Sequence, residues 1–172
     1  MNNDPRFPIG KFDAGNYPSR IDNAKAIADL PTNVRNAVDG LSDAQLDTPY
    51  RDGGWTLRQT VHHLADSHIN SFCRFKLALT EDEAPTIRPY YEDRWAELAD
   101  SGTPVDASLK IIDGVHSRWS SLLESMTDDD FDREFIHPET GAWTLEKVLA
   151  LYAWHSQHHT AHITNARVQN GW

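Results

Sequence analysis

Cysteine is nearly absent from this sequence, since Cys73 is the single cysteine among 172 residues. One cysteine excludes an internal disulfide framework and is typical of proteins from a reducing compartment. The amino-terminal stretch "MNNDPRFPIGKF" is polar and contains prolines, so we expect no secretory signal peptide. These two observations predict a cytoplasmic protein.

Long apolar runs and an excess of positive charge are also missing. No stretch approaches the roughly 18 consecutive apolar residues that a membrane-spanning helix needs, and the formal net charge is -10, with 16 Lys and Arg against 26 Asp and Glu. Phosphate recognition requires clustered basic residues. We therefore expect neither a membrane nor a nucleic acid as partner, and we interpret the acidic surface as one that favours solubility.

Strand-forming patterns are rare as well, apart from a weak "REFIH", whereas helical periodicity is abundant. Residues 1–18 contain three prolines and predict an extended arm. We expect a first helix over 20–39, capped by Ser19 and kinked or broken at Pro31, and one or two helical turns in "YEDRWAEL". Longer helices are predicted to start after Thr56, after Pro104 and after Thr144, and to end near residues 80, 126 and 169.

Four long amphipathic segments in a chain of this length predict one all-α domain over residues 1–172, folded as an antiparallel four-helix bundle with an extended N-terminal arm. The motif "GWTL" at residues 54–57 returns as "AWTL" at residues 142–145, and each copy opens a helix that carries histidines. Two interpretations remain open, namely an internal duplication and a recurrent packing of Trp before a Thr cap.

The last helix carries four histidines within eight positions, in "HSQHHTAH". At about 100° per residue, the mean direction of its apolar residues falls close to His159 and within about 40° of His155, whereas His158 and His162 lie further to the side. Side chains four residues apart share one helix face. Two inward imidazoles are costly to bury unless their nitrogens find partners, so this pair predicts a shared divalent metal, with hydrogen-bonded core histidines as the alternative.

A catalytic metal site needs a third protein ligand and an open position. The second helix offers His62, His63 and His68, and its apolar face is centred near His68, with His63 about 140° away. Helical periodicity alone therefore favours His68. No HExxH motif is present, which argues against a zinc protease of that type.

Five segments, in this order, resemble the YfiT-like branch of the DinB superfamily over almost the whole chain. They are "PIGKF", "LDTPYRDGGWTLRQTVHHLADSHINSF", "RPYYEDRWAELAD", "FIHPETG" and "LALYAWHSQHHTAHI". The resemblance implies a four-helix bundle that binds one divalent metal per chain, zinc or nickel, through His63, eight residues after Trp55, and the pair His155 and His159. It thus disagrees with helical periodicity at one position, where we follow the resemblance and keep His68 as the alternative.

The resemblance also implies a metal-dependent hydrolase that acts on a small molecule and forms cytoplasmic homodimers. Relatives in the wider superfamily use low-molecular-weight thiols such as bacillithiol, so a metal-dependent thiol S-transferase is the alternative. A basic residue near the metal would favour it, and the candidates are Arg74, Arg88, Arg94 and Arg118. A second alternative is a non-catalytic bundle in which the metal only joins helices, with His68, His158 or His162 as a fourth ligand.

Overall fold

The computed structural model describes residues 4–172. Residues 1–3, which belong to the arm predicted over 1–18 and to the domain predicted over 1–172, lie outside the described residues. The helices are η1 (Ala14–Asn16), α1 (Arg20–Val38), α2 (Asp43–Leu46), α3 (Leu57–Thr80), α4 (Glu92–Trp95), η2 (Ala99–Gly102), α5 (Asp106–Ser125), α6 (Asp128–Asp132) and α7 (Leu145–Asn170). Two short strands, β1 (Glu134–His137) and β2 (Gly141–Thr144), precede α7.

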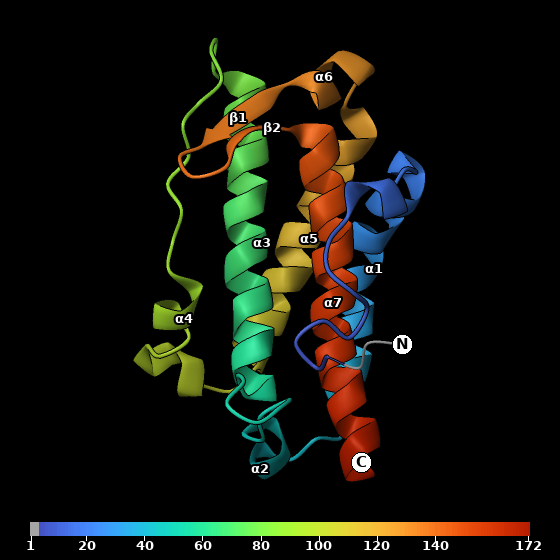
Figure 1. Ribbon diagram of the computed structural model, residues 1–172, viewed down its shortest axis with the longest axis vertical. Helices are drawn as coiled ribbons and strands as arrows, with labels where there is room; N and C mark the ends of the chain where they lie inside the picture. The colour runs from blue at the N-terminus through green and yellow to red at the C-terminus, as the bar shows by residue number, and fades with distance from the viewer. Residues whose placement is uncertain (1–3) are drawn as a thin grey trace.

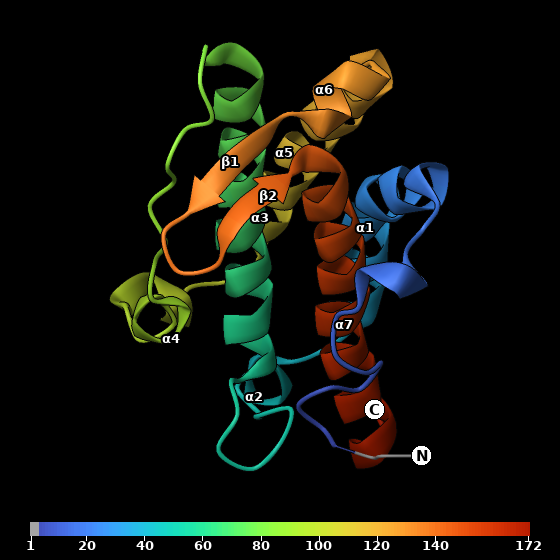
Figure 2. The same cartoon turned by 45° about the horizontal axis from the view of Figure 1, so that its top comes forward.

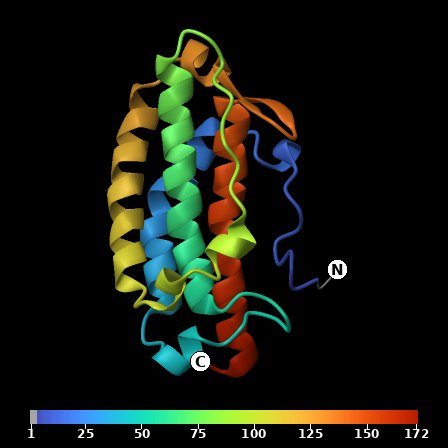
Figure 3. The same ribbon diagram turned by 90° about the vertical axis from the view of Figure 1, so that its left-hand side faces the viewer.

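The four long helices α1, α3, α5 and α7 form a bundle, which confirms the predicted fold class (Figure 1). Helix α1 packs between α5 and α7, and α3 packs against the same two helices. Helices α3 and α7 run in opposite directions, but α3 and α5 run in the same direction, because the connecting segment returns along the length of the bundle (Figure 3). The antiparallel arrangement therefore holds for α3 with α7 and for α1 with α5, whereas α1 and α7 are parallel.

Side-chain caps set the beginnings of three long helices. The hydroxyls of Ser19, Thr56 and Thr144 each accept a hydrogen bond from a backbone N–H of the first helical turn. Such caps satisfy donors that have no partner within the helix. Helix α1 continues through Pro31 without a break. The cap residues predicted from the sequence are thus confirmed. The histidines of α3 and α7 therefore lie in the helical turns that the predicted helix starts imply.

The small elements lie around the ends and sides of the bundle. Strands β1 and β2 pair antiparallel and cover one end of α3 and α7 (Figure 2). The weak strand pattern in "REFIH" thus corresponds to β1, with the turn at residues 138–140 leading to Gly141, whose φ is +81°. The N-terminal arm is irregular apart from η1 and follows α7, where the indole of Trp154 donates to the carbonyl of Gly10. Within residues 4–172, none of the helices combines the length and apolar composition needed to span a bilayer.

Candidate metal centre

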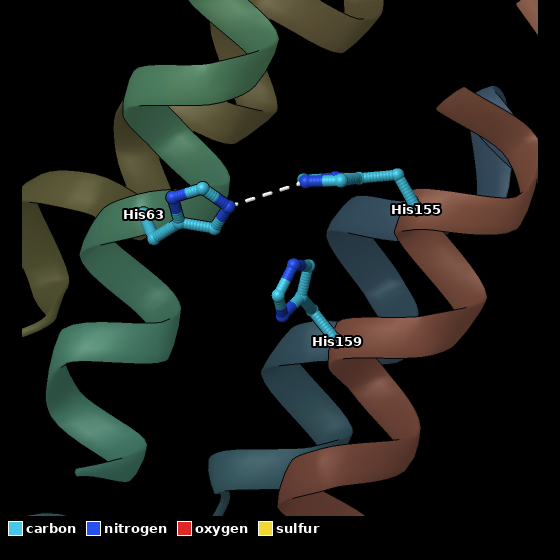
Figure 4. Close-up of side chains that lie close together, drawn as sticks. All are labelled: His63, His155 and His159. Carbon is cyan, nitrogen blue, oxygen red and sulfur yellow. Dashed lines mark hydrogen bonds between the residues drawn. The ribbon is translucent and has the colours of Figure 1, made fainter. Parts of the chain in front are cut away.

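Helices α3 and α7 bring three histidines together at their contact. His63 lies in the second turn of α3, and His155 and His159 lie one turn apart on α7. One ring nitrogen from each lies within 4.8 Å of the other two, and the Nε2 atoms of His63 and His155 are 3.2 Å apart. Figure 4 shows His63 directed from α3 toward both histidines of α7. These are the three residues that the family resemblance implied as ligands.

The spacing and the protonation of these rings suit a divalent ion. Two nitrogens bound tetrahedrally to one zinc at its usual bond length lie about 3.3 Å apart, close to the 3.2 Å that separates His63 Nε2 from His155 Nε2. Burial lowers the pKa of His63 to about 4 and, together with the neighbouring imidazoles, lowers the pKa values of His155 and His159 well below the usual value. All three rings are therefore neutral near pH 7, as metal coordination requires.

Trp55 forms one wall of this cluster. Its ring centroid lies 4.6 Å from that of His63 and 6.4 Å from that of His159. The turn before it depends on two glycines: Gly53 has a φ of +63°, and a Cβ at Gly54 would lie 2.7 Å from Cγ of Arg51. The motif that opens α3 thus supplies an aromatic wall as well as a helix cap.

A cavity of about 1380 Å³ opens over the three histidines. Its size and position give a small molecule access to the nitrogens of the cluster. Burial raises the pKa of the Tyr90 hydroxyl, so this group stays protonated and can donate a hydrogen bond. The other lining residues include Arg6, Tyr50, Arg51, Arg74, Arg88, Glu92, Glu139 and His137.

His68, which helical periodicity favoured, occupies a different place. It is fully buried, and its Nε2 lies 3.1 Å from Nδ1 of His155, the ring nitrogen not directed at His63. Its Nδ1 lies 3.0 Å from Nε2 of His116 on α5. His62 is further removed, with its ring nitrogens bonded to the hydroxyl of Ser108 and the carbonyl of Thr103.

His158 and His162 are buried, although helical periodicity placed them at the side of the inward face. The N-terminal arm and the loop before α3 cover them. The ring centroid of Phe7 lies 6.1 Å from that of His158, and Tyr50 stacks on His162 with ring centroids 4.0 Å apart. With His159 they form a second group of three nitrogens within 4.8 Å, which shares His159 with the first group. The sequence signals for this burial are Phe7 of the arm and Tyr50 of the loop before α3, since periodicity within α7 cannot report contacts from outside the bundle.

Three comparisons relate the chain to known proteins. A family model described as the DinB superfamily matches residues 26–163. A Bacillus cereus (strain B4264) protein named "Putative metal-dependent hydrolase" is 52% identical over 99% of both chains, and a Bacillus thuringiensis protein of the same name is 51% identical over 99% of both. These relatives span nearly the whole length of this chain.

Two solved structures have a similar fold. The structure of YfiT from Bacillus subtilis, described as "a probable metal-dependent hydrolase with an unusual four-helix bundle topology", matches with a TM-score of 0.93 and 48% identity over 98% of each chain. A mycothiol-dependent maleylpyruvate isomerase matches with a TM-score of 0.68 and 14% identity, over 84% of this chain and 60% of that one. The second likeness concerns the fold alone.

Proposed function

This chain belongs to the DinB superfamily, and from its relatives and its histidine cluster we propose that it is a metal-dependent hydrolase whose ion is held by His63, His155 and His159. The observation that carries the proposal is the convergence of three neutral imidazole nitrogens beneath a cavity large enough for a small substrate. The metal-dependent hydrolase names of its relatives support the same activity.

The proposed ion is zinc, with nickel as the alternative, at one ion per chain. Imidazole nitrogens suit both metals, and zinc accepts three protein ligands with a further position for water or substrate. Among residues 4–172 the cluster around His63 contains three histidines and no fourth ligand. An open position favours catalysis over the non-catalytic alternative, in which His68, His158 or His162 would close the site.

The bound ion would supply Lewis acidity and lower the pKa of a coordinated water to about 7. The residues of the chain hold and orient the reactants around it. The protonated Tyr90 hydroxyl can donate to a polar substrate atom, and Trp55 shields His63 and His159 from solvent on one side. An apolar surface that excludes water lowers the local dielectric constant and so strengthens the polar interactions formed next to it.

The test combines metal analysis with a hydrolysis screen. Protein purified without added metal is expected to contain about one divalent ion per chain or to take it up from excess zinc or nickel. Turnover of a panel of small esters, amides and phosphoesters is expected to stop after chelation and to return with the metal. Substoichiometric metal that excess zinc and nickel cannot restore would contradict the metal site, and chelator-resistant turnover would contradict its role in hydrolysis.

Thiol S-transfer is the second candidate, favoured by two arginines of the cavity wall. Arg74 and Arg88 line the cavity, and within residues 4–172 neither forms an ion pair. Low-molecular-weight thiols such as bacillithiol carry carboxylates that such arginines can bind. The other two candidates lie against rings instead, Arg94 on Tyr91 and Arg118 on Phe72.

A matched pair of variants tests this candidate. Arg88→Ala is expected to weaken binding of a carboxylate-bearing thiol about tenfold or more, because a charge-assisted hydrogen bond contributes about 1.5 to 3 kcal/mol. Arg94→Ala serves as the control and is expected to leave binding unchanged. Equal thiol affinities of parent and Arg88→Ala would argue against S-transfer through this wall.

We also propose that the protein is a cytoplasmic homodimer, as the family resemblance implies. Light scattering after gel filtration measures the mass in solution directly. A mass of twice 19.5 kDa is expected, and a monomer at micromolar concentration would refute the association.

A further inference from the structure

A line of hydrogen-bonded rings leads from the backbone of α1 to the histidine cluster. Nδ1 of His116 lies 2.6 Å from the carbonyl oxygen of Ile27. The other nitrogen of His116 lies 3.0 Å from Nδ1 of His68, and the other nitrogen of His68 lies 3.1 Å from Nδ1 of His155. His116 and His68 are 1% and 0% exposed, so the line runs through the interior of the bundle.

Pro31 explains why this carbonyl is available. In a helix the carbonyl of residue 27 accepts from the N–H of residue 31, but proline has no N–H. The carbonyl of Ile27 therefore lacks its helical partner inside α1. His116, from the neighbouring helix α5, supplies the missing donor, and a buried carbonyl without a partner would be costly.

The carbonyl sets the direction of every bond in the line. A carbonyl oxygen only accepts, so the proton of His116 is on Nδ1 and, in a neutral ring, Nε2 accepts. Nδ1 of His68 must then donate to it, which leaves Nε2 of His68 as an acceptor. By the same step His155 donates from Nδ1, and its Nε2 carries a free lone pair directed at the Nε2 of His63, 3.2 Å away.

From this geometry we propose that His116 and His68 are positioning residues that hold His155 in the tautomer able to bind the ion. The inference rests on the proposed metal site and adds two residues to it. Histidine ligands usually donate their second nitrogen to a partner that fixes tautomer and ring orientation. Here that partner is His68, whose nitrogens can either donate or accept. A second histidine, His116, and the carbonyl of Ile27 are therefore needed to fix the tautomer of His68.

The opposite order of protons would disable the site. If His68 carried its proton on Nε2, His155 would have to accept at Nδ1 and carry its own proton on Nε2. That proton would occupy the nitrogen that faces His63, and a protonated nitrogen cannot bind a metal. The carbonyl of Ile27 excludes this order as long as His116 connects it to His68.

Nuclear magnetic resonance of the metal-free protein tests the tautomers directly. With ¹⁵N-labelled histidine, the ring nitrogen shifts and long-range proton couplings are expected to place the proton on Nδ1 in His116, His68 and His155. A proton on Nε2 of His155 or His68 in the parent protein would overturn the inference. This measurement needs neither bound metal nor activity, so it separates failure of this inference about the line of rings from failure of the proposed function.

Variants of His116 test the consequence for metal binding. His116→Phe preserves a ring of similar size but disconnects His68 from the carbonyl, and we expect a mixture of His155 tautomers and a 10- to 100-fold weaker zinc affinity in a competition titration with a chelator. His116→Gln is expected to restore most of the affinity, because its amide can donate to the carbonyl and accept from His68.

His62→Phe is the matched control, since it removes a buried, hydrogen-bonded histidine of α3 that lies outside the line. Its zinc affinity is expected to equal that of the parent. A His116→Phe protein with parental zinc affinity and a parental His155 spectrum would overturn the inference. If His116→Phe does not fold, the comparison of His116→Gln with the parent and the parental spectrum still decide it.

Discussion

Replacing His63 by alanine tests the proposed metal site most sharply, because the adjacent His62 provides a control. The two histidines are 9% and 8% exposed and lie on the same helix. His63→Ala removes one of three nitrogens from the cluster, whereas His62→Ala removes hydrogen bonds to Ser108 and Thr103. Both variants lose a buried ring, and only one is expected to lose metal.

The magnitude follows from linkage between binding and folding. At free zinc equal to 100 times the Kd of the parent, binding stabilises the folded state by about 2.7 kcal/mol. In a chain of this length that raises the Tm by about 5 to 11 °C. If His63→Ala weakens binding 100-fold, the contribution at the same zinc concentration falls to about 0.4 kcal/mol and the zinc-dependent shift falls to about 1 °C.

Thermal unfolding with zinc and with chelator measures this difference for each variant. A lost packing contact lowers the Tm in both conditions, whereas a lost ligand lowers the zinc-dependent shift. His62→Ala is therefore expected to have a lower Tm with an undiminished shift. A His63→Ala protein that keeps the full zinc-dependent shift would refute the assignment of His63 as a ligand.

Three further predictions concern His116, Gly54 before α3 and Arg58 in the first turn of α3. Burial lowers the pKa of His116 to about 4, so between pH 6.5 and 4 the unfolded chain binds more protons than the folded one. The metal-free protein should therefore lose stability as the pH falls. In urea unfolding, the free energy of unfolding should decrease less from pH 7 to pH 5 in His116→Phe than in the parent. Gly54→Ala should cost about 1 to 3 kcal/mol, because its Cβ would lie 2.7 Å from Arg51; Gly102→Ala, with no neighbour within 4 Å, is the control. Arg58→Met should cost about 1 to 3 kcal/mol in urea unfolding, because it removes the ion pair of an arginine side chain that is only 6% exposed. The loss is limited because its partner Asp47 is 58% exposed and regains water. A loss below about 0.5 kcal/mol, the usual range for a surface substitution, would contradict this.

The long elements of the fold could be predicted from the sequence because their signals are local. Ser19, Thr56 and Thr144 have the residue types that cap helices, and each stands directly before an amphipathic segment. The short helices α2 and α6 were not predicted, since one turn carries no periodicity, whereas the turns expected in "YEDRWAEL" correspond to α4. The direction of α5 relative to α3 also depends on the path of residues 81–105, which contains no regular element longer than one turn.

Helical periodicity placed His63, His158 and His162 away from the interior, although all three are buried, because it assumes one buried face. Helix α3 packs against α5 and α7, and Trp55 covers a further side next to His63. His63 therefore lies among other rings although it is far from the apolar face. The tryptophan-to-histidine spacing of the family indicated this residue, since it reports a contact between the turn and the helix.

His63 and His68 are both buried, but their ring nitrogens have different surroundings. An apolar face identifies which rings lie in the interior, and His68 is the most deeply buried of the α3 histidines. A metal ligand needs in addition a lone pair directed at a shared point, and both nitrogens of His68 already face other histidines. In the proposed order of protons, its Nε2 accepts from Nδ1 of His155 and would orient that ring, but it lies outside the group of three nitrogens proposed to bind the ion. Burial alone therefore does not distinguish a proposed ligand such as His63 from a proposed positioning residue such as His68, and the distinction depends on the position of each proton.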